Sequence, residues 1–159
     1  MKVLFLDIDG VLNSEEDYRE YSLKNGRPAP IEFYTDAKVR MISDICTRTG
    51  ANIVLSSTWR KGLTLEEGAI LFERLGLPAV LVGFTPDFSS EGRPPRGHEI
   101  KYFVDNHTLP EEIEKFAVID DDSDAGQSLP SGGKFFQTTF GKGITEEIKN
   151  QIIEYLEEK

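Results

Sequence analysis

Short apolar runs recur along the chain and predict buried strands. The first, KVLFLD at 2–7, has no polar interruption before its last residue, which is typical of a strand covered on both faces in a parallel sheet. Four later runs have the same character and predict four further strands: NIVLSS at 52–57, AVLVGF at 79–84, KFAVIDD at 115–121 and KFFQTT at 134–139.

Apolar residues recur at helical spacing between most of these runs. The segment 37–49 carries an apolar stripe, follows Thr35 or Asp36 as its N-cap and ends at Gly50. Three more helices are predicted over 64–76, 98–107 and 145–159, the first with a capping box at Thr64 and Glu67 and the last with Thr145 as its N-cap.

Strands that alternate with helices imply a parallel sheet with right-handed crossovers. Residues 13–34 interrupt this alternation, because they are polar and contain Gly26, Pro28 and Pro30, and we expect an irregular segment there. The 159 residues are enough for one compact core and show no repeat or linker. We therefore expect a single domain over 1–159.

Composition and charge narrow the classes of protein. The chain is 38% hydrophobic and 29% charged, and no apolar run approaches the ~20 residues that a membrane helix needs. The N-terminus MKVLFLDIDG lacks the apolar region of a signal peptide, and Cys46, a single cysteine expected to lie buried in a helix, excludes an internal disulfide. We expect a cytoplasmic protein with no membrane partner. The net charge of −10 argues against general nucleic-acid affinity but leaves room for a local basic site.

Polar side chains follow three of the predicted strands at the point where each strand ends. Asp7 ends the first strand, Ser56 the second, and Asp120 and Asp121 the fourth. Ligands bind beyond the carboxyl ends of parallel strands, so these side chains should meet at one edge of the sheet. Clustered carboxylates repel each other unless a cation intervenes, and Mg2+ suits one or two carboxylates together with a substrate phosphate.

Three segments at these strand ends resemble the motifs of the haloacid dehalogenase (HAD) superfamily of phosphatases. DIDGVL at 7–12 resembles motif one, NIVLSS at 52–57 resembles motif two, and AVIDDDSD at 117–124 resembles motif four, in the order and spacing of that superfamily. The resemblance implies a three-layer, Rossmann-like α/β fold with helices on both faces of a parallel sheet ordered 3-2-1-4-5.

The same resemblance implies a phosphatase mechanism. Asp7 would be the nucleophile that forms an aspartyl-phosphate, and Asp9 would protonate the leaving oxygen and then activate water. Asp121 would complete a Mg2+ site with Asp7 and the backbone carbonyl of Asp9. The expected reaction is Mg2+-dependent hydrolysis of a phosphate monoester.

Other site residues are assigned with alternatives. Ser56 is expected to donate a hydrogen bond to the phosphate, and Ser57 is the alternative. The resemblance also implies a cation ahead of the fourth strand that neutralises the phosphate. Arg96 is favoured over Lys101 in this role, because Gly97 permits close approach to it.

Five residues near the motifs are harder to assign. Asp120 and Asp124 are accessory candidates, with Asp124 either orienting the site or contacting the basic segment at 96–101, whereas Asp122 is expected in solvent. Trp59 and Arg60, in SSTWR, could hold a base and a backbone phosphate. The alternative is that Trp59 packs under the following helix and Arg60 lies at the surface.

The segment 13–34 is too short for the large cap domain of many HAD phosphatases, so we expect a minimal cap loop and an open site. An open site suits a macromolecular end, or a small substrate enclosed by a partner subunit. SSTWR, RGHEI, VIDDDSD and FFQTTFGKGIT resemble, less specifically, the HAD phosphatase domains of nucleic-acid repair enzymes, which remove terminal phosphates. The expected partner is a phosphorylated substrate, either a small molecule or a nucleic-acid end.

Two other classes of protein also gather acids at strand ends. One is a non-catalytic HAD-like scaffold, and the other is a receiver-like module that accepts a phosphoryl group. A receiver needs no acid two residues beyond the phosphorylated one, and this chain has both Asp7 and Asp9. The sequence therefore favours the enzyme.

Overall fold

A single parallel sheet forms the centre of the protein. The computed structural model describes residues 1–77 and 81–159. The strands β1 (Lys2–Leu6), β2 (Asn52–Leu55), β3 (Leu81–Phe84), β4 (Lys115–Asp120) and β5 (Gly133–Gln137) lie in the order β3-β2-β1-β4-β5, with all neighbours parallel. This arrangement confirms the predicted α/β fold and its strand order. Residues 79 and 80 of the strand predicted over 79–84 lie outside the described residues.

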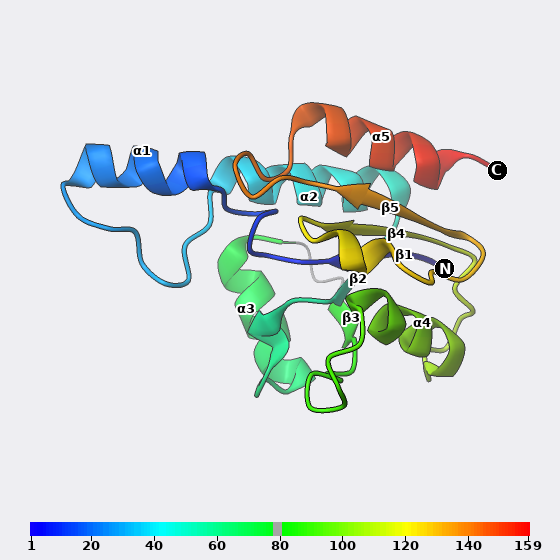
Figure 1. The fold of residues 1–159 in the computed structure, drawn as a ribbon. Coiled ribbons are helices and arrows are strands. Elements are labelled where there is room, and N and C mark those ends of the chain that lie inside the picture. The colour runs from blue at the N-terminus through cyan, green and yellow to red at the C-terminus, as the bar shows by residue number, and fades with distance from the viewer. Residues whose placement is uncertain (78–80) are drawn as a thin grey trace.

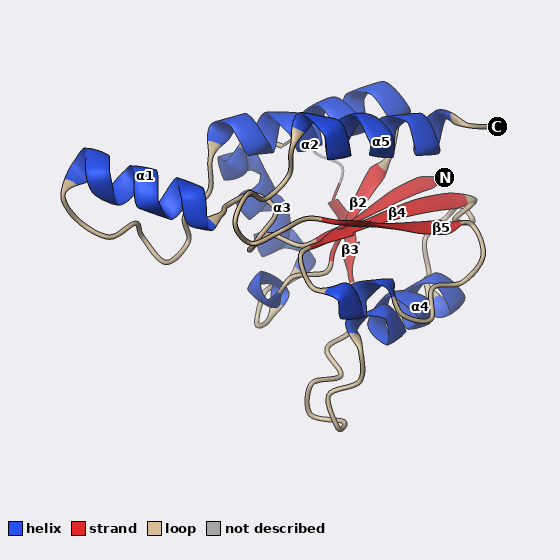
Figure 2. Cartoon of the chain, turned by 45° about the horizontal axis from the view of Figure 1, so that its top comes forward, coloured by secondary structure: helices blue, strands red, loops and turns tan. Residues whose placement is uncertain are grey.

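Helices cover both faces of the sheet (Figures 1 and 2). The apolar side chains of α2 (Asp36–Thr49), α3 (Leu65–Leu75) and α5 (Glu146–Glu157) join one buried cluster with alternate residues of the central strands. The other strand residues pack against α4 (Arg96–Asn106) and the short 3-10 helix η2 (Ser123–Gly126). The alternation of strand side chains between two apolar layers explains why the sequence of β1 shows no polar interruption.

Local capping fixes the ends of most helices as the sequence predicts. The Thr64 hydroxyl accepts a hydrogen bond from the Glu67 N–H, and the Glu67 carboxylate accepts one from the Thr64 N–H, which completes the capping box of α3. The Thr145 hydroxyl accepts a hydrogen bond from the Ile148 N–H at the start of α5. Gly50 ends α2 in the left-handed conformation at φ 71°.

The prediction of an irregular segment over 13–34 is wrong for its first half, because the structure has a helix, α1, at Glu15–Asn25. The Ser14 hydroxyl accepts a hydrogen bond from the Asp17 N–H, and Gly26 at φ 64° ends the helix. Acids occupy the first turn and a lysine the last, which complements the helix dipole. No residue of the helix is fully buried, so it carries no apolar stripe that sequence periodicity could reveal.

This helix projects from the body of the protein (Figure 1). Tyr18 and Tyr21 pack against Phe33 in the following loop, with ring centroids 5.3 and 5.1 Å apart. The Lys38 ammonium of α2 lies 2.7 Å from the Asp17 carboxylate, and both side chains are largely buried. These contacts attach α1 to the domain by one end.

Cys46 is buried in α2, as predicted, and burial raises the pKa of its thiol to about 12. Among the residues that the structure describes, none of the helices combines the length and the apolar character required to cross a bilayer.

Candidate active site

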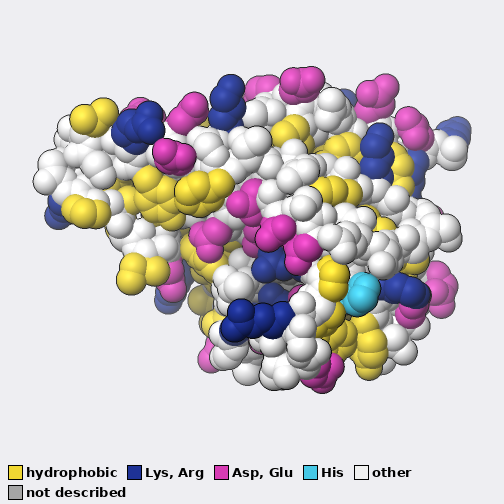
Figure 3. Space-filling view, in the orientation of Figure 1, with side chains coloured by type: hydrophobic (Ala, Val, Ile, Leu, Met, Phe, Trp, Pro, Cys, Tyr) yellow, Lys and Arg dark blue, Asp and Glu magenta, His cyan; other side chains and the backbone are white. Residues whose placement is uncertain are grey.

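The ends of β1 and β4 bring three carboxylates together. The pairing of Leu6 with Ile119 places Asp7 beside Asp120, and the Asp7 N–H donates to the Ile119 carbonyl at 3.1 Å. One carboxylate oxygen from each of Asp7, Asp120 and Asp121 lies within 4.8 Å of the others. Acidic side chains accordingly gather in the middle of the face shown in Figure 3.

Burial makes this cluster electrostatically costly. Asp7 is 5% exposed and Asp120 1% exposed. Desolvation, reinforced by the charge of Asp120, raises the pKa of Asp7 well above its ordinary value. Desolvation likewise raises the pKa of Asp120 to about 6, although Arg96 opposes the rise. A divalent cation would stabilise the ionised form of these carboxylates, and carboxylate oxygens are ligands that Mg2+ prefers. The three acids therefore fit a Mg2+ site.

A glycine allows the chain to pass this close to the acids. Gly10 has φ 79°, and a Cβ at this position would lie 2.4 Å from the Cγ of Asp121. The Gly10 N–H donates to the Asn13 side chain at 2.9 Å, and its carbonyl accepts from the Thr138 hydroxyl at 2.6 Å. The turn after β1 is therefore fixed from both sides, with no room for a side chain.

The Asp9 carboxylate is held apart from the three acids. Its Oδ1 accepts a hydrogen bond from the Asn13 amide at 2.9 Å, and its Oδ2 accepts one from the Trp59 indole Nε1–H at 3.0 Å. Within residues 1–77 and 81–159, no hydrogen bond reaches the Asp9 backbone carbonyl. Asp9 can thus offer its carbonyl oxygen to a cation while its carboxylate faces elsewhere.

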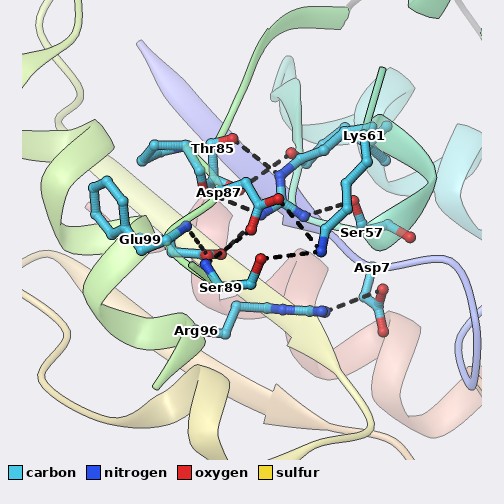
Figure 4. A network of polar contacts seen from close by, with 12 residues as sticks. Asp7, Ser57, Lys61, Thr85, Asp87, Ser89, Arg96 and Glu99 are labelled. Carbon is cyan, nitrogen blue, oxygen red and sulfur yellow. Dashed lines mark hydrogen bonds and ion pairs between the residues drawn. The ribbon is translucent and has the colours of Figure 1, made fainter. Parts of the chain in front are cut away.

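The first residue of α4 supplies the cation of the site. The Arg96 Nη1 lies 2.9 Å from the Asp120 Oδ2 and 3.3 Å from the Asp7 Oδ1, and Figure 4 shows the guanidinium directed at Asp7. The Arg96 N–H also donates to Asp124 at 3.0 Å, so of the two roles considered for Asp124 the structure shows the contact with the 96–101 segment. A Cβ on Gly97 would lie 1.8 Å from the Gln127 carbonyl oxygen, which accounts for the glycine.

The structure does not bring Lys101 to the three acids. Its ammonium pairs with Asp105 one helical turn along α4, where both side chains are half exposed. Asp122 is exposed, as expected, and its carboxylate accepts a hydrogen bond from the Asp124 N–H.

The two serines after β2 differ in what their hydroxyls contact. In the described part of the chain, the buried Ser56 Oγ has no hydrogen-bond partner. The Ser57 Oγ accepts a hydrogen bond from the Trp59 N–H at 3.3 Å, at the start of a short 3-10 helix, η1 (Thr58–Arg60). An unpartnered buried hydroxyl costs stability, so Ser56 is the serine with an unused donor at the sheet edge.

The expectation that Arg60 lies at the surface is wrong, since Arg60 is only 5% exposed. Its guanidinium donates to the carbonyls of Thr85, Ser57 and Pro86 and lies 2.9 Å from the Glu99 carboxylate. With these acceptors around it, the guanidinium is turned into the protein rather than toward a substrate phosphate. Trp59 is half-buried and packs against the main apolar cluster, as the packing alternative proposed. Its indole N–H also donates a hydrogen bond to the Asp9 carboxylate.

Sequence reasoning missed three residues that support the site. Asn13 bridges Gly10 and Asp9, Thr138 holds the Gly10 carbonyl, and Glu99 neutralises Arg60. The position of Asn13, three residues after the glycine of motif one, is a local signal that could have indicated it. Thr138 and Glu99 act across 128 and 39 residues of chain, so no local pattern marks them.

Comparison with known proteins identifies the fold and the family of the chain. A solved structure, the HAD domain of effector protein Lem4 from Legionella pneumophila, has a TM-score of 0.59 and 16% identity, covering 98% of this chain and 95% of that chain, and shows the same fold. No curated protein sequence matches the chain. A family model, the HAD domain in Swiss Army Knife RNA repair proteins, matches residues 3–148. The chain belongs to this family of HAD domains.

Proposed function

We propose that the protein is a Mg2+-dependent phosphomonoesterase that works through an aspartyl-phosphate on Asp7. The observation that carries the proposal is the convergence on one buried carboxylate. Asp7 lies beside Asp120 and Asp121, contacts Arg96 and shares the sheet edge with the unpartnered hydroxyl of Ser56. A nucleophile, a cation and a neutral donor therefore surround one position where a phosphoryl group could bind.

The first half of the reaction transfers the phosphoryl group to the protein. An Asp7 oxygen attacks phosphorus and forms a P–O bond, while the bond from phosphorus to the leaving oxygen breaks. The leaving oxygen keeps the bonding electron pair and takes a proton from Asp9. Arg96 and Ser56 would hold the phosphoryl oxygens during the transfer.

The second half returns Asp7 to its starting state. Asp9, now ionised, takes a proton from water as the water oxygen attacks phosphorus. The bond between phosphorus and Asp7 breaks, which releases inorganic phosphate and leaves Asp9 protonated for the next cycle. The hydrogen bonds from Trp59 and Asn13 would keep the Asp9 carboxylate in one orientation throughout.

Asp7, Asp121 and the Asp9 carbonyl would hold Mg2+, with Asp120 beside them. When bound, the ion supplies positive charge that lets an anionic carboxylate meet an anionic phosphate. The same charge would offset the desolvation and the repulsion between carboxylates that raise the pKa of Asp7 and Asp120.

For the substrate, we propose the terminal phosphate of a nucleic-acid strand or a nucleotide. The matching family is described by its occurrence in RNA repair proteins. The segment after β1 adds only one projecting helix rather than an enclosing domain, which suits a strand end (Figure 1). The net charge of −10 is consistent with recognition of an end rather than of a long backbone.

Activity measurements on Asp7→Asn test the proposal. We expect wild-type protein to hydrolyse para-nitrophenyl phosphate only with Mg2+, and Asp7→Asn to lower kcat by about a thousandfold or more. Asp105→Asn is the matched control, because in the described part of the chain this exposed acid on α4 pairs with Lys101 alone, and it should retain wild-type kcat. Equal turnover by wild type and Asp7→Asn would refute the mechanism, and absence of Mg2+-dependent turnover from wild type would indicate a non-catalytic scaffold.

A further inference from the structure

A groove of about 750 Å3 is lined by Asp9 but by none of Asp7, Asp120 and Asp121. It runs between α3 and the loop that follows α1. Its walls include Asp9, Trp59, Ile31, Ile70, Leu71 and Arg74. This volume lies within the range of small-molecule sites, roughly 300–1,000 Å3.

Apolar side chains are exposed to solvent in the groove. Ile31 is 95% exposed and Ile70 46% exposed, and both line the groove. Exposed apolar side chains that gather in a concave region with a few polar groups mark a binding site more often than isolated ones do. The polar side chains that line the groove beside them are Asp9, Glu32, Thr58, Lys61, Glu67 and Arg74.

Asp9 connects this groove to the chemistry. Under the proposed function, Asp9 gives its proton to the leaving oxygen, so the leaving group must lie within hydrogen-bond reach of the Asp9 carboxylate. Asp9 lines the groove, and so does Trp59, which donates a hydrogen bond to it. The leaving group therefore enters on the groove side of the phosphate.

A second, smaller cleft of about 210 Å3 contains Arg96 but is a poorer candidate for the leaving group. Asp9 does not line it. Two of its cations are paired within the protein, since Lys61 lies 3.3 Å from Asp87 (Figure 4) and Arg60 lies 2.9 Å from Glu99. Apart from Pro94, the side chains that line this cleft are polar or charged, whereas the groove also presents Trp59, Ile70 and Leu71.

We propose that the groove is the leaving-group site and that it selects a nucleoside. This inference rests on the proposed function and specifies its substrate. A nucleobase is flat and largely apolar on its faces, which matches Trp59, Ile70 and Leu71, and its polar edges and sugar hydroxyls match the charged side chains at the rim. A sugar or polyol phosphate is polar all round and gains nothing from these apolar walls.

The position of Trp59 allows a direct binding measurement. Trp59 is the single tryptophan of the chain, so intrinsic tryptophan fluorescence reports on the groove alone. In Asp7→Asn protein with Mg2+, a nucleoside monophosphate should quench this fluorescence with saturation, whereas glycerol phosphate and inorganic phosphate should not. Equal signals from nucleotide and inorganic phosphate would overturn the proposal.

Selectivity measurements on a groove variant give the second test. Ile70→Asp places a charge in the groove on the solvent side of α3, and we expect it to lower kcat/KM for a nucleoside monophosphate about tenfold more than kcat/KM for acetyl phosphate. Leu23→Asp is the matched control, because Leu23 is 82% exposed on α1 and lies outside the groove. It should leave both values unchanged. Equal losses on the two substrates in Ile70→Asp, or the same ratio change in Leu23→Asp, would contradict the assignment.

The two tests separate failure of the groove from failure of the enzyme. A wild-type protein that hydrolyses para-nitrophenyl phosphate but shows neither nucleotide quenching nor nucleotide selectivity would retain the proposed function and lose the groove assignment. A protein that hydrolyses no ester but binds a nucleotide with Trp59 quenching would lose the function and keep the groove. A mononucleotide and a short 3′-phosphorylated RNA carry the same nucleoside, and the ratio of their kcat/KM values distinguishes a free nucleotide from a strand end.

Discussion

Glu99→Gln should be strongly destabilising, because it breaks the buried ion pair with Arg60 and leaves the guanidinium without its counter-charge. The two side chains are 4% and 8% exposed, with Nη2 and Oε2 2.9 Å apart. The other carboxylate oxygen accepts a hydrogen bond from the Phe88 N–H at 2.9 Å. A glutamine has one oxygen and one NH2 group, so either orientation sets a donor against a donor. Removing one partner of a buried pair typically costs 3–5 kcal/mol, and because glutamine keeps one hydrogen bond we expect about 3 kcal/mol.

Urea denaturation of the Glu99→Gln protein tests this magnitude. The free energy of unfolding should fall by about 3 kcal/mol with an unchanged m-value, and the Tm by roughly 6–12 °C. Asp105→Asn, on the same helix, removes a half-exposed ion pair and should change the free energy by less than about 0.5 kcal/mol. A Glu99→Gln protein as stable as the Asp105→Asn protein would refute the argument, because it would mean that water reaches Arg60.

Two further predictions concern the stability of the acidic site. In urea titrations, Gly10→Ala should lower the free energy of unfolding by about 1–2 kcal/mol more than Gly62→Ala does. Both glycines have φ near 78°, but only a Cβ at position 10 meets Asp121. Equal losses in the two variants would show that Asp121 moves aside freely. Metal-free protein should gain stability as the pH falls from 6 to 4. The pKa of Asp120 is raised to about 6 by burial, so the folded state binds a proton that the unfolded state does not, and we expect a gain on the order of 1–3 kcal/mol by thermal melts across this pH window. Asp120→Asn should flatten the profile, and an unchanged slope in that variant would contradict the assignment to Asp120.

The strands and most helix ends were predictable because their signals are local. A run such as KVLFLD has few alternatives to a buried strand, and the capping box at Thr64 lies within four residues of chain. The helix α1 was missed because apolar periodicity was the criterion, and α1 packs through its two tyrosines against Phe33 instead of through a stripe. Its capping signals, Ser14 and Gly26, were present in the sequence.

Of the site, the sequence could predict the residues that lie directly at the ends of the strands. Asp7, Asp120 and Asp121 could be placed together because each follows the apolar run of its strand, and Leu6 pairs with Ile119 in the parallel register of β1 with β4. The partners of Arg60 could not be predicted, because Glu99 lies 39 residues away and approaches only through the packing of α4. Of the two serines, the one with a free hydroxyl emerged only from the hydrogen bonds around it.

The two arginines have different tasks that depend on each other. Glu99 lies three residues beyond Arg96 on α4, so the buried pair with Arg60 fixes the first turn of the helix that presents Arg96 to Asp7. Arg60 follows Trp59 directly, so the same pair also anchors the turn that carries the hydrogen bond to Asp9. One contact therefore holds both the cation beside Asp7 and the donor to Asp9. For this reason Glu99→Gln should lower kcat as well as stability, although Glu99 contacts neither the Asp7 nor the Asp9 carboxylate. A variant that lost stability but kept full activity would show that other contacts position α4 and the Trp59 turn.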